Sequence, residues 1–136
     1  MRKILCLLPL LLFAFLVNAQ DVSAVKVNEQ TEALSQVYSL NDTQTGEMLK
    51  IQDRKLRNLA SIEHLKQEDE ELYYQKLKAI QYNTDVSIQR LLNSDQMKIF
   101  YQRSVDRRQR QAELARKLQN QGATPKEIER ALIEME

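Results

Sequence analysis

Side chains that could perform catalysis are scarce in this chain of 136 residues. It contains one cysteine, Cys6, and one histidine, His64, and its two glycines, Gly46 and Gly122, lie far apart. The sequence has neither a glycine-rich phosphate loop nor a nucleophile elbow, the motifs that position phosphates and attacking serines. We therefore expect no enzymatic activity and no cofactor.

His64 is the residue that suggests a metal ion. It lies close in sequence to Glu63 and Glu68, and imidazole and carboxylate groups both bind transition metals. A single imidazole with carboxylates makes a weak site, because stable sites usually combine several His or Cys ligands. We expect a solvated His64 and no metal site.

A stretch of positive charge between residues 103 and 117 is the best candidate for a binding surface. It contains six cations and two acids: Arg103, Arg107, Arg108, Arg110, Arg116 and Lys117 with Asp106 and Glu113. Such an excess speeds the encounter with a partner of opposite charge. We predict that Arg103, Arg107 and Arg110 contact unfolded polypeptide clients. The alternative is a helix that is only solvated, or that pairs with the acids at 68–71 across a dimer seam.

The first 19 residues have the pattern of a cleavable signal peptide. Arg2 and Lys3 precede an apolar run over 4–17, and Ala19 offers a small residue before the cut. The run is too short for a membrane span, which needs about 20 apolar residues. We expect a mature chain of residues 20–136, a single domain without a transmembrane segment, located in the periplasm or secreted.

The composition of residues 20–136 predicts a thin core. Leu, Ile, Val and Phe make up 27 of these 117 residues, little more than the level of about 20% below which chains tend to stay unfolded. A small core is often supplemented by a partner surface, so we expect a homodimer. The same residues hold 18 Lys and Arg and 19 Asp and Glu, a balance that argues against binding to nucleic acid.

The pattern of apolar residues predicts an all-α fold. Between 47 and 121 there is no Gly or Pro, and good helix formers dominate. Apolar residues recur at steps of three and four, as on one face of a helix: Tyr73, Leu77, Ile80, Thr84, Ile88 and Leu91. A weaker stripe follows: Met97, Tyr101, Val105, Ala112 and Ala115. We predict helices over 26–38, 42–66, 68–91, 94–120 and 125–134, with a bend near Lys66–Gln67 or, alternatively, one continuous helix there.

Two of these predicted helices begin with nearly the same five residues. In Leu40-Asn41-Asp42-Thr43-Gln44, Asn41 is a strong N-cap and Gln44 stands where its amide can reach back to the N–H of the cap. Leu92-Asn93-Ser94-Asp95-Gln96 repeats the arrangement, with Leu92 placed to pack on Met97. A third capping box is predicted where Thr124 precedes Pro125 and Glu127.

The repeated motif resembles the LTxxQ signature that occurs twice in the Spy/CpxP family of periplasmic helical proteins. The resemblance covers about residues 38–120. Asn41 and Asn93 stand where the signature has Thr, and the two motifs are closer together than we expect for that family. The alternative is that the repeat reflects only the general need of helices for caps.

The resemblance implies an elongated, bent helical hairpin of four to five helices that pairs as an antiparallel, cradle-like dimer. It also implies an ATP-independent periplasmic chaperone that holds unfolded or stress-damaged envelope proteins. The alternative function is a helical regulatory protein that docks on an envelope sensor, and a metal-sensing role comes third. The aggregation of a denatured protein in the presence of this chain would separate these functions.

Overall fold

The computed structural model describes residues 8–135, with side chains from residue 23 onwards. It contains six helical segments: α1 (Leu8–Tyr38), α2 (Asp42–Ile62), α3 (Leu65–Glu68), α4 (Glu70–Leu91), α5 (Ser94–Asn120) and α6 (Pro125–Glu134). No strand occurs within residues 8–135, so the predicted all-α class is confirmed.

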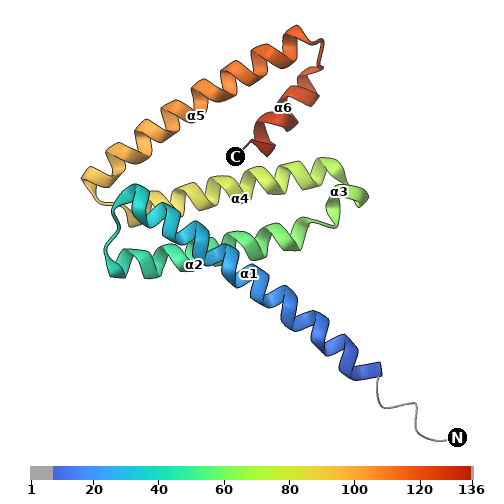
Figure 1. Cartoon of the computed structure of the whole chain (residues 1–136). Coiled ribbons are helices and arrows are strands. Elements are labelled where there is room, and N and C mark those ends of the chain that lie inside the picture. The colour runs from blue at the N-terminus through green and yellow to red at the C-terminus, as the bar shows by residue number, and fades with distance from the viewer. Residues whose placement is uncertain (1–7, 136) are drawn as a thin grey trace, which may run out of the picture.

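Two of the helices, α2 and α4, form an antiparallel hairpin, and α1, α5 and α6 are arranged around it. α2 and α4 run side by side, joined by the short α3, and α1 crosses α2 (Figure 1). α5 leaves the end of α4 and diverges from it, and α6 folds back from the far end of α5 towards α4. The main backbone contacts of α5 are therefore with α1 near its beginning and with α6 at its end.

Capping boxes begin three of the helices, as the sequence predicts. Asn41 and Asn93 adopt nearly identical extended conformations, with φ and ψ of −78° and 173° in one and −79° and 177° in the other. In each box, the asparagine side chain accepts a hydrogen bond from the backbone N–H of the glutamine three residues on. The side-chain oxygen of that glutamine accepts a hydrogen bond from the backbone N–H of the asparagine. Thr124 and Glu127 form the third box. These bonds satisfy amide groups that the first turn of a helix leaves unpaired.

The chain turns between α2 and α4, close to the predicted bend. α2 ends at Ile62, and α3 is separated from α4 by Asp69, whose side chain caps α4 by accepting from the N–H of Leu72 at 3.0 Å. The alternative of one continuous helix through Lys66–Gln67 is therefore wrong. The acids that follow suit the first turn of α4, where N–H groups carry partial positive charge.

The first helix is longer than predicted, because it begins at Leu8 and not at residue 26. The predicted cut after Ala19 falls inside it. Residues 1–7 of the predicted signal peptide lie outside the described residues, so the cleavage remains a prediction. Among the helices of the described chain, none combines the length and apolar character that crossing a bilayer would require.

Two clusters of buried side chains stabilise the fold. The hairpin core lies between α2, α3, α4 and α6 and consists of Ile62, Leu65, Tyr73, Leu77, Ile80 and Ile133. The junction core lies where α1, α2, α4 and α5 meet and consists of Tyr38, Met48, Ile51, Ile88 and Phe100. The stripe predicted on α4 is thus confirmed, since its members from Tyr73 to Ile88 are buried.

The stripe predicted on α5 is wrong. Tyr101 is 60% exposed and Val105 is 48% exposed, whereas Gln96 and Phe100 are the buried residues of this helix. The buried residues of α5 are each one position before the predicted ones. Because Gln96 and Phe100 face the junction core, Tyr101 faces outwards. The outer side of α5 consequently presents apolar side chains to solvent.

Candidate functional site

The glutamines of the two repeated motifs bind each other directly. Gln44 Nε2 donates to Gln96 Oε1 at 2.7 Å, and Gln96 Nε2 donates to Gln44 Oε1 at 3.0 Å. Each oxygen also accepts from the backbone N–H of its own cap, Asn41 at 3.2 Å and Asn93 at 2.9 Å. The repetition in the sequence therefore joins two helix beginnings that lie 52 residues apart.

The contacts of this glutamine pair have a local two-fold symmetry. Gln44 Nε2 also donates to the carbonyl of Leu91 at 3.0 Å, and Gln96 Nε2 to the carbonyl of Ser39 at 3.3 Å. Leu91 and Ser39 each precede the leucine of the opposite motif. Each amide thus uses both of its N–H groups and accepts two bonds at its oxygen, its full capacity. Only an amide can fill this role, since a carboxylate has no donor.

The leucines of the motifs enclose the glutamine pair on its apolar side. Leu40 and Leu92 are half-buried against the junction core, and Met97 packs there as well. Met48, which follows Gln44 by one turn, is fully buried. All six motif residues named from the sequence therefore serve to position α2 and α5 at one junction.

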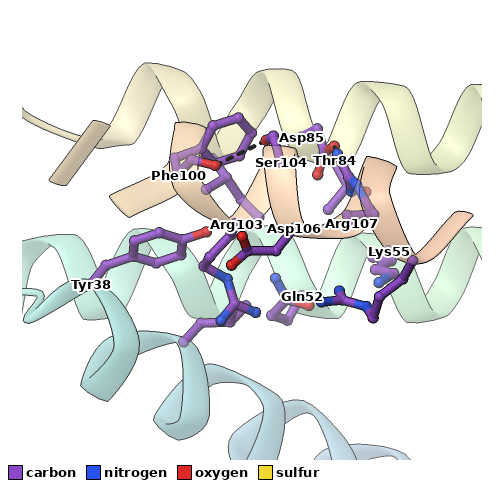
Figure 2. Close-up of a pocket in the computed structure, with 13 residues that line it drawn as sticks. Tyr38, Gln52, Lys55, Thr84, Asp85, Phe100, Arg103, Ser104, Asp106 and Arg107 are labelled. Carbon is purple, nitrogen blue, oxygen red and sulfur yellow. Dashed lines mark hydrogen bonds and ion pairs between the residues drawn. The ribbon is translucent and has the colours of Figure 1, made fainter. Parts of the chain in front are cut away.

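A basic pocket lies next to this junction. Its cavity has a volume of about 230 Å³ and is lined by Leu34, Tyr38, Gln52, Lys55, Thr84, Asp85, Ile88, Phe100, Ser104, Asp106, Arg103, Arg107 and Arg110. The lining comes from α1, α2, α4 and α5 (Figure 2). The structure thus brings the three arginines of the predicted client site to one cavity.

Charge in the basic pocket is only partly compensated. Arg107 Nη2 contacts Asp85 Oδ2 at 2.8 Å, with about a third of each side chain exposed. Burial raises the pKa of the Tyr38 phenol, and the positive charge of the nearby Arg103 opposes that shift. Tyr38 therefore stays a neutral phenol and leaves the positive charge of Arg103 uncompensated.

The floor of the basic pocket contains a buried amide. Gln52 is 2% exposed, and its one hydrogen bond within the described part of the chain is a weak one from Nε2 to Met48 Sδ at 3.5 Å. Leu34, Ile88 and Phe100 supply the apolar part of the lining.

An apolar groove lies on the other side of Asp85, between α4, α5 and α6. Its volume is about 740 Å³, and it is lined by Lys78, Gln81, Tyr82, Asp85, Gln111, Ala115, Gln119, Pro125, Ile128, Glu129, Leu132 and Ile133. Tyr82 at its rim is 69% exposed. The groove lies where α6 folds back from the diverging end of α5 and contacts both α5 and α4 (Figure 1).

The remaining residues singled out from the sequence have local roles. His64 is exposed, and its Nε2 lies 3.9 Å from Glu68 Oε2. Within residues 23–135 no group of three or more His, Cys, Asp and Glu side chains could hold a metal ion. Tyr73 belongs to the hairpin core, as predicted, whereas Tyr74 donates a 2.6 Å hydrogen bond to Glu134.

The acids at the start of α4 pair within the chain. Glu70 contacts Arg130 at 2.6 Å and Glu71 contacts Lys126 at 3.1 Å, so both pair with α6. Lys126 also lowers the pKa of Glu71, mainly through their hydrogen bond. The predicted alternative, in which the acids at 68–71 pair with the 103–117 stretch across a dimer seam, stays a prediction.

The sequence does not indicate which other residues line the basic pocket. Lys55, Asp85 and Tyr38 line the same cavity as the three arginines but lie on three other helices. One signal was available for Tyr38, an aromatic residue two positions before the first motif. Asp85 carries no such signal, because it is one of several polar residues beside the α4 stripe.

Comparisons of the chain with protein-family models, with curated proteins and with solved structures find no match. The features of the molecule that bear on function are therefore the junction, the basic pocket and the apolar groove.

Proposed function

We propose that this protein is a periplasmic, ATP-independent binding protein of the chaperone type, which holds unfolded or stress-damaged envelope proteins. The observation that carries the proposal is the placement of the basic pocket and the apolar groove side by side along α5, meeting at Asp85. The resemblance of the two motifs to the LTxxQ signature supports the same function. Export to the periplasm is part of the proposal and follows from the leader-like residues 1–19.

The two hollows supply the two properties that a chaperone without a nucleotide needs. Positive charge at the basic pocket speeds the encounter with a client, and apolar surface in the groove holds exposed apolar side chains of that client. The groove is wide and open rather than closed, which suits weak binding of many different segments. Ala115 and Leu132 provide apolar surface on two of its walls.

Aggregation of a chemically denatured model protein tests the proposal directly. Purified residues 20–136 in several-fold molar excess should delay aggregation without ATP. The double substitution Arg103→Glu and Arg110→Glu should shorten that delay. Arg108→Glu with Arg116→Glu is the matched control, because it changes the net charge equally at exposed positions of α5 outside both hollows.

A second pair of variants tests the apolar groove. Ala115 lines the groove and is half-buried, whereas Ala112 on the same helix is exposed and lies outside it. Ala115→Gln should reduce protection and Ala112→Gln should not. No delay of aggregation by the unaltered protein would contradict the proposed function.

Docking onto a single envelope partner, such as a sensor, is the second candidate. The apolar side chains exposed on α5, which include Ile99, Tyr101 and Val105, favour it because they form a surface that a partner or a second copy could cover. A pulldown from envelope extract separates the candidates. One stoichiometric partner would support docking, and many unfolded proteins would support the chaperone function. The metal-sensing alternative has no observation in its favour within the described residues.

A further inference from the structure

The basic pocket is smaller than the apolar groove and is partly open to solvent. Its volume of about 230 Å³ lies below the range of about 300–1,000 Å³ found for sites of drug-sized ligands. A group of the size of one amino-acid residue is what such a cavity accommodates. The pocket therefore binds one residue-sized group of a ligand and not a long segment.

The charge of the pocket selects an anion. Lys55, Arg103, Arg107 and Arg110 outnumber Asp85 and Asp106, which leaves a net charge of +2 in the lining. Asp85 is paired with Arg107. Among the described residues, Lys55, Arg103 and Arg110 form no ion pair with any acid. Guanidinium groups bind carboxylates with two parallel hydrogen bonds, so a carboxylate is the anion that suits this lining.

The buried amide of Gln52 adds a second requirement. A buried polar group without a good partner costs free energy, and the thioether of Met48 is a weak acceptor. A peptide group brought into the cavity would satisfy both the N–H and the carbonyl of this amide.

Leu34, Ile88 and Phe100 add a third requirement, which is an apolar side chain. One chemical group combines a carboxylate, a peptide bond and an apolar side chain within the size of one residue, and it is the end of a polypeptide. The carboxylate of an internal Asp or Glu lies farther from its peptide groups, on a polar side chain.

We infer that the basic pocket binds the carboxyl terminus of a client polypeptide that ends in an apolar residue. The terminal carboxylate lies among Lys55, Arg103 and Arg110, and the last peptide group bonds to Gln52. This inference rests on the proposed function, because the chain end belongs to a client. It adds that the protein recognises free chain ends as well as exposed apolar segments.

A pair of labelled tetrapeptides tests the inference. Acetyl-Ala-Ala-Ala-Leu with a free carboxyl terminus should bind the full chain at least about tenfold more tightly than the same peptide with a carboxyl-terminal amide, because the amide loses the charged hydrogen bonds. Arg103→Gln with Arg110→Gln should abolish this preference. Both residues are exposed, so the variant keeps its fold, which circular dichroism checks. Arg108→Gln with Arg116→Gln should retain the preference.

Equal affinity for the two peptides would overturn the inference. The inference would also be overturned if acetate or inorganic phosphate competed as strongly as the free-acid peptide, because the site would then recognise a small anion. Delay of aggregation without any preference for the free acid would remove this inference and keep the proposed function. A preference without any delay of aggregation would support the pocket and contradict the proposed function.

Discussion

Gln44 and Gln96 bind each other through two reciprocal hydrogen bonds at the point where α2 and α5 begin. A capping box by itself accepts Glu as readily as Gln at this position. The reciprocal pair does not, because each residue must donate as well as accept. The two roles of these residues can therefore be separated by experiment.

Gln96→Glu tests whether the paired role is important for stability. At neutral pH the variant should lose about 1–3 kcal/mol of unfolding free energy, since it removes two donors and places a charge at a site that is 7% exposed. Urea denaturation measures this loss. In the unpaired third box, Glu127→Gln should cost less than about 1 kcal/mol. Equal, small losses in both variants would show that the pair adds nothing to capping.

The two glycines should respond to alanine with opposite signs. Gly46 lies inside α2 with open space where a Cβ would be, so Gly46→Ala should raise the unfolding free energy by about 0.5–1 kcal/mol. Gly122 has a φ of +83°, a conformation that alanine rarely adopts, so Gly122→Ala should lower it by about 1 kcal/mol. Thermal unfolding of both variants measures the difference. Shifts in the same direction would contradict the turn geometry between α5 and α6.

Tyr74 should ionise at unusually high pH. Its hydrogen bond to Glu134, together with burial, raises its pKa to about 12. Because the folded state favours the neutral phenol, the stability contributed by Tyr74 is present below pH 10 and is lost as the pH rises towards 12. Ultraviolet titration of the protein and of Tyr74→Phe isolates this tyrosine. Glu134→Gln should lower its pKa and Glu129→Gln should not, and identical curves for the two variants would contradict the assignment.

Arg130 should contribute more than Lys126 to holding α6 on α4. Its guanidinium contacts Glu70 at 2.6 Å and lies 5.0 Å from the centre of the Tyr74 ring, and its side chain is 23% exposed. Arg130→Ala should cost about 1 kcal/mol. Lys126→Ala should cost less than about 0.5 kcal/mol, since the pair with Glu71 is mostly exposed.

Hydrogen exchange of the α6 amides measures this difference locally. Hydrogen exchange should accelerate more in Arg130→Ala than in Lys126→Ala. The double variant Arg130→Glu with Glu70→Arg, in which the two charges are swapped, should recover part of the protection. Equal acceleration in both single variants would indicate that Ile133 alone holds the helix.

The helices and their beginnings are predictable from the sequence, because caps and periodicity act over a few residues. Asn41, Asn93 and Thr124 each start a helix as expected. The buried face of α5 is not predictable in the same way. Its two possible stripes, through Phe100 or through Tyr101, have the same spacing, and the position of α1 and α4 decides between them.

The basic pocket, too, is only partly predictable from the sequence. The sequence identifies Arg103, Arg107 and Arg110 as one basic group, since they lie within eight residues of each other. It does not reveal the cavity, because Tyr38, Gln52 and Asp85 reach it from three other helices. Nor does it reveal that the two motif glutamines meet, which depends on the α2–α4 hairpin bringing both ends of the repeat together.

α5 has the mechanics of a lever. It extends for about 40 Å at 1.5 Å per residue, and its pivot is the glutamine pair at its first turn. A rotation of about 10° there would displace the far end by about 7 Å over that length. Small adjustments of two amide groups would thus change the width of the groove along its whole length without unwinding the helix.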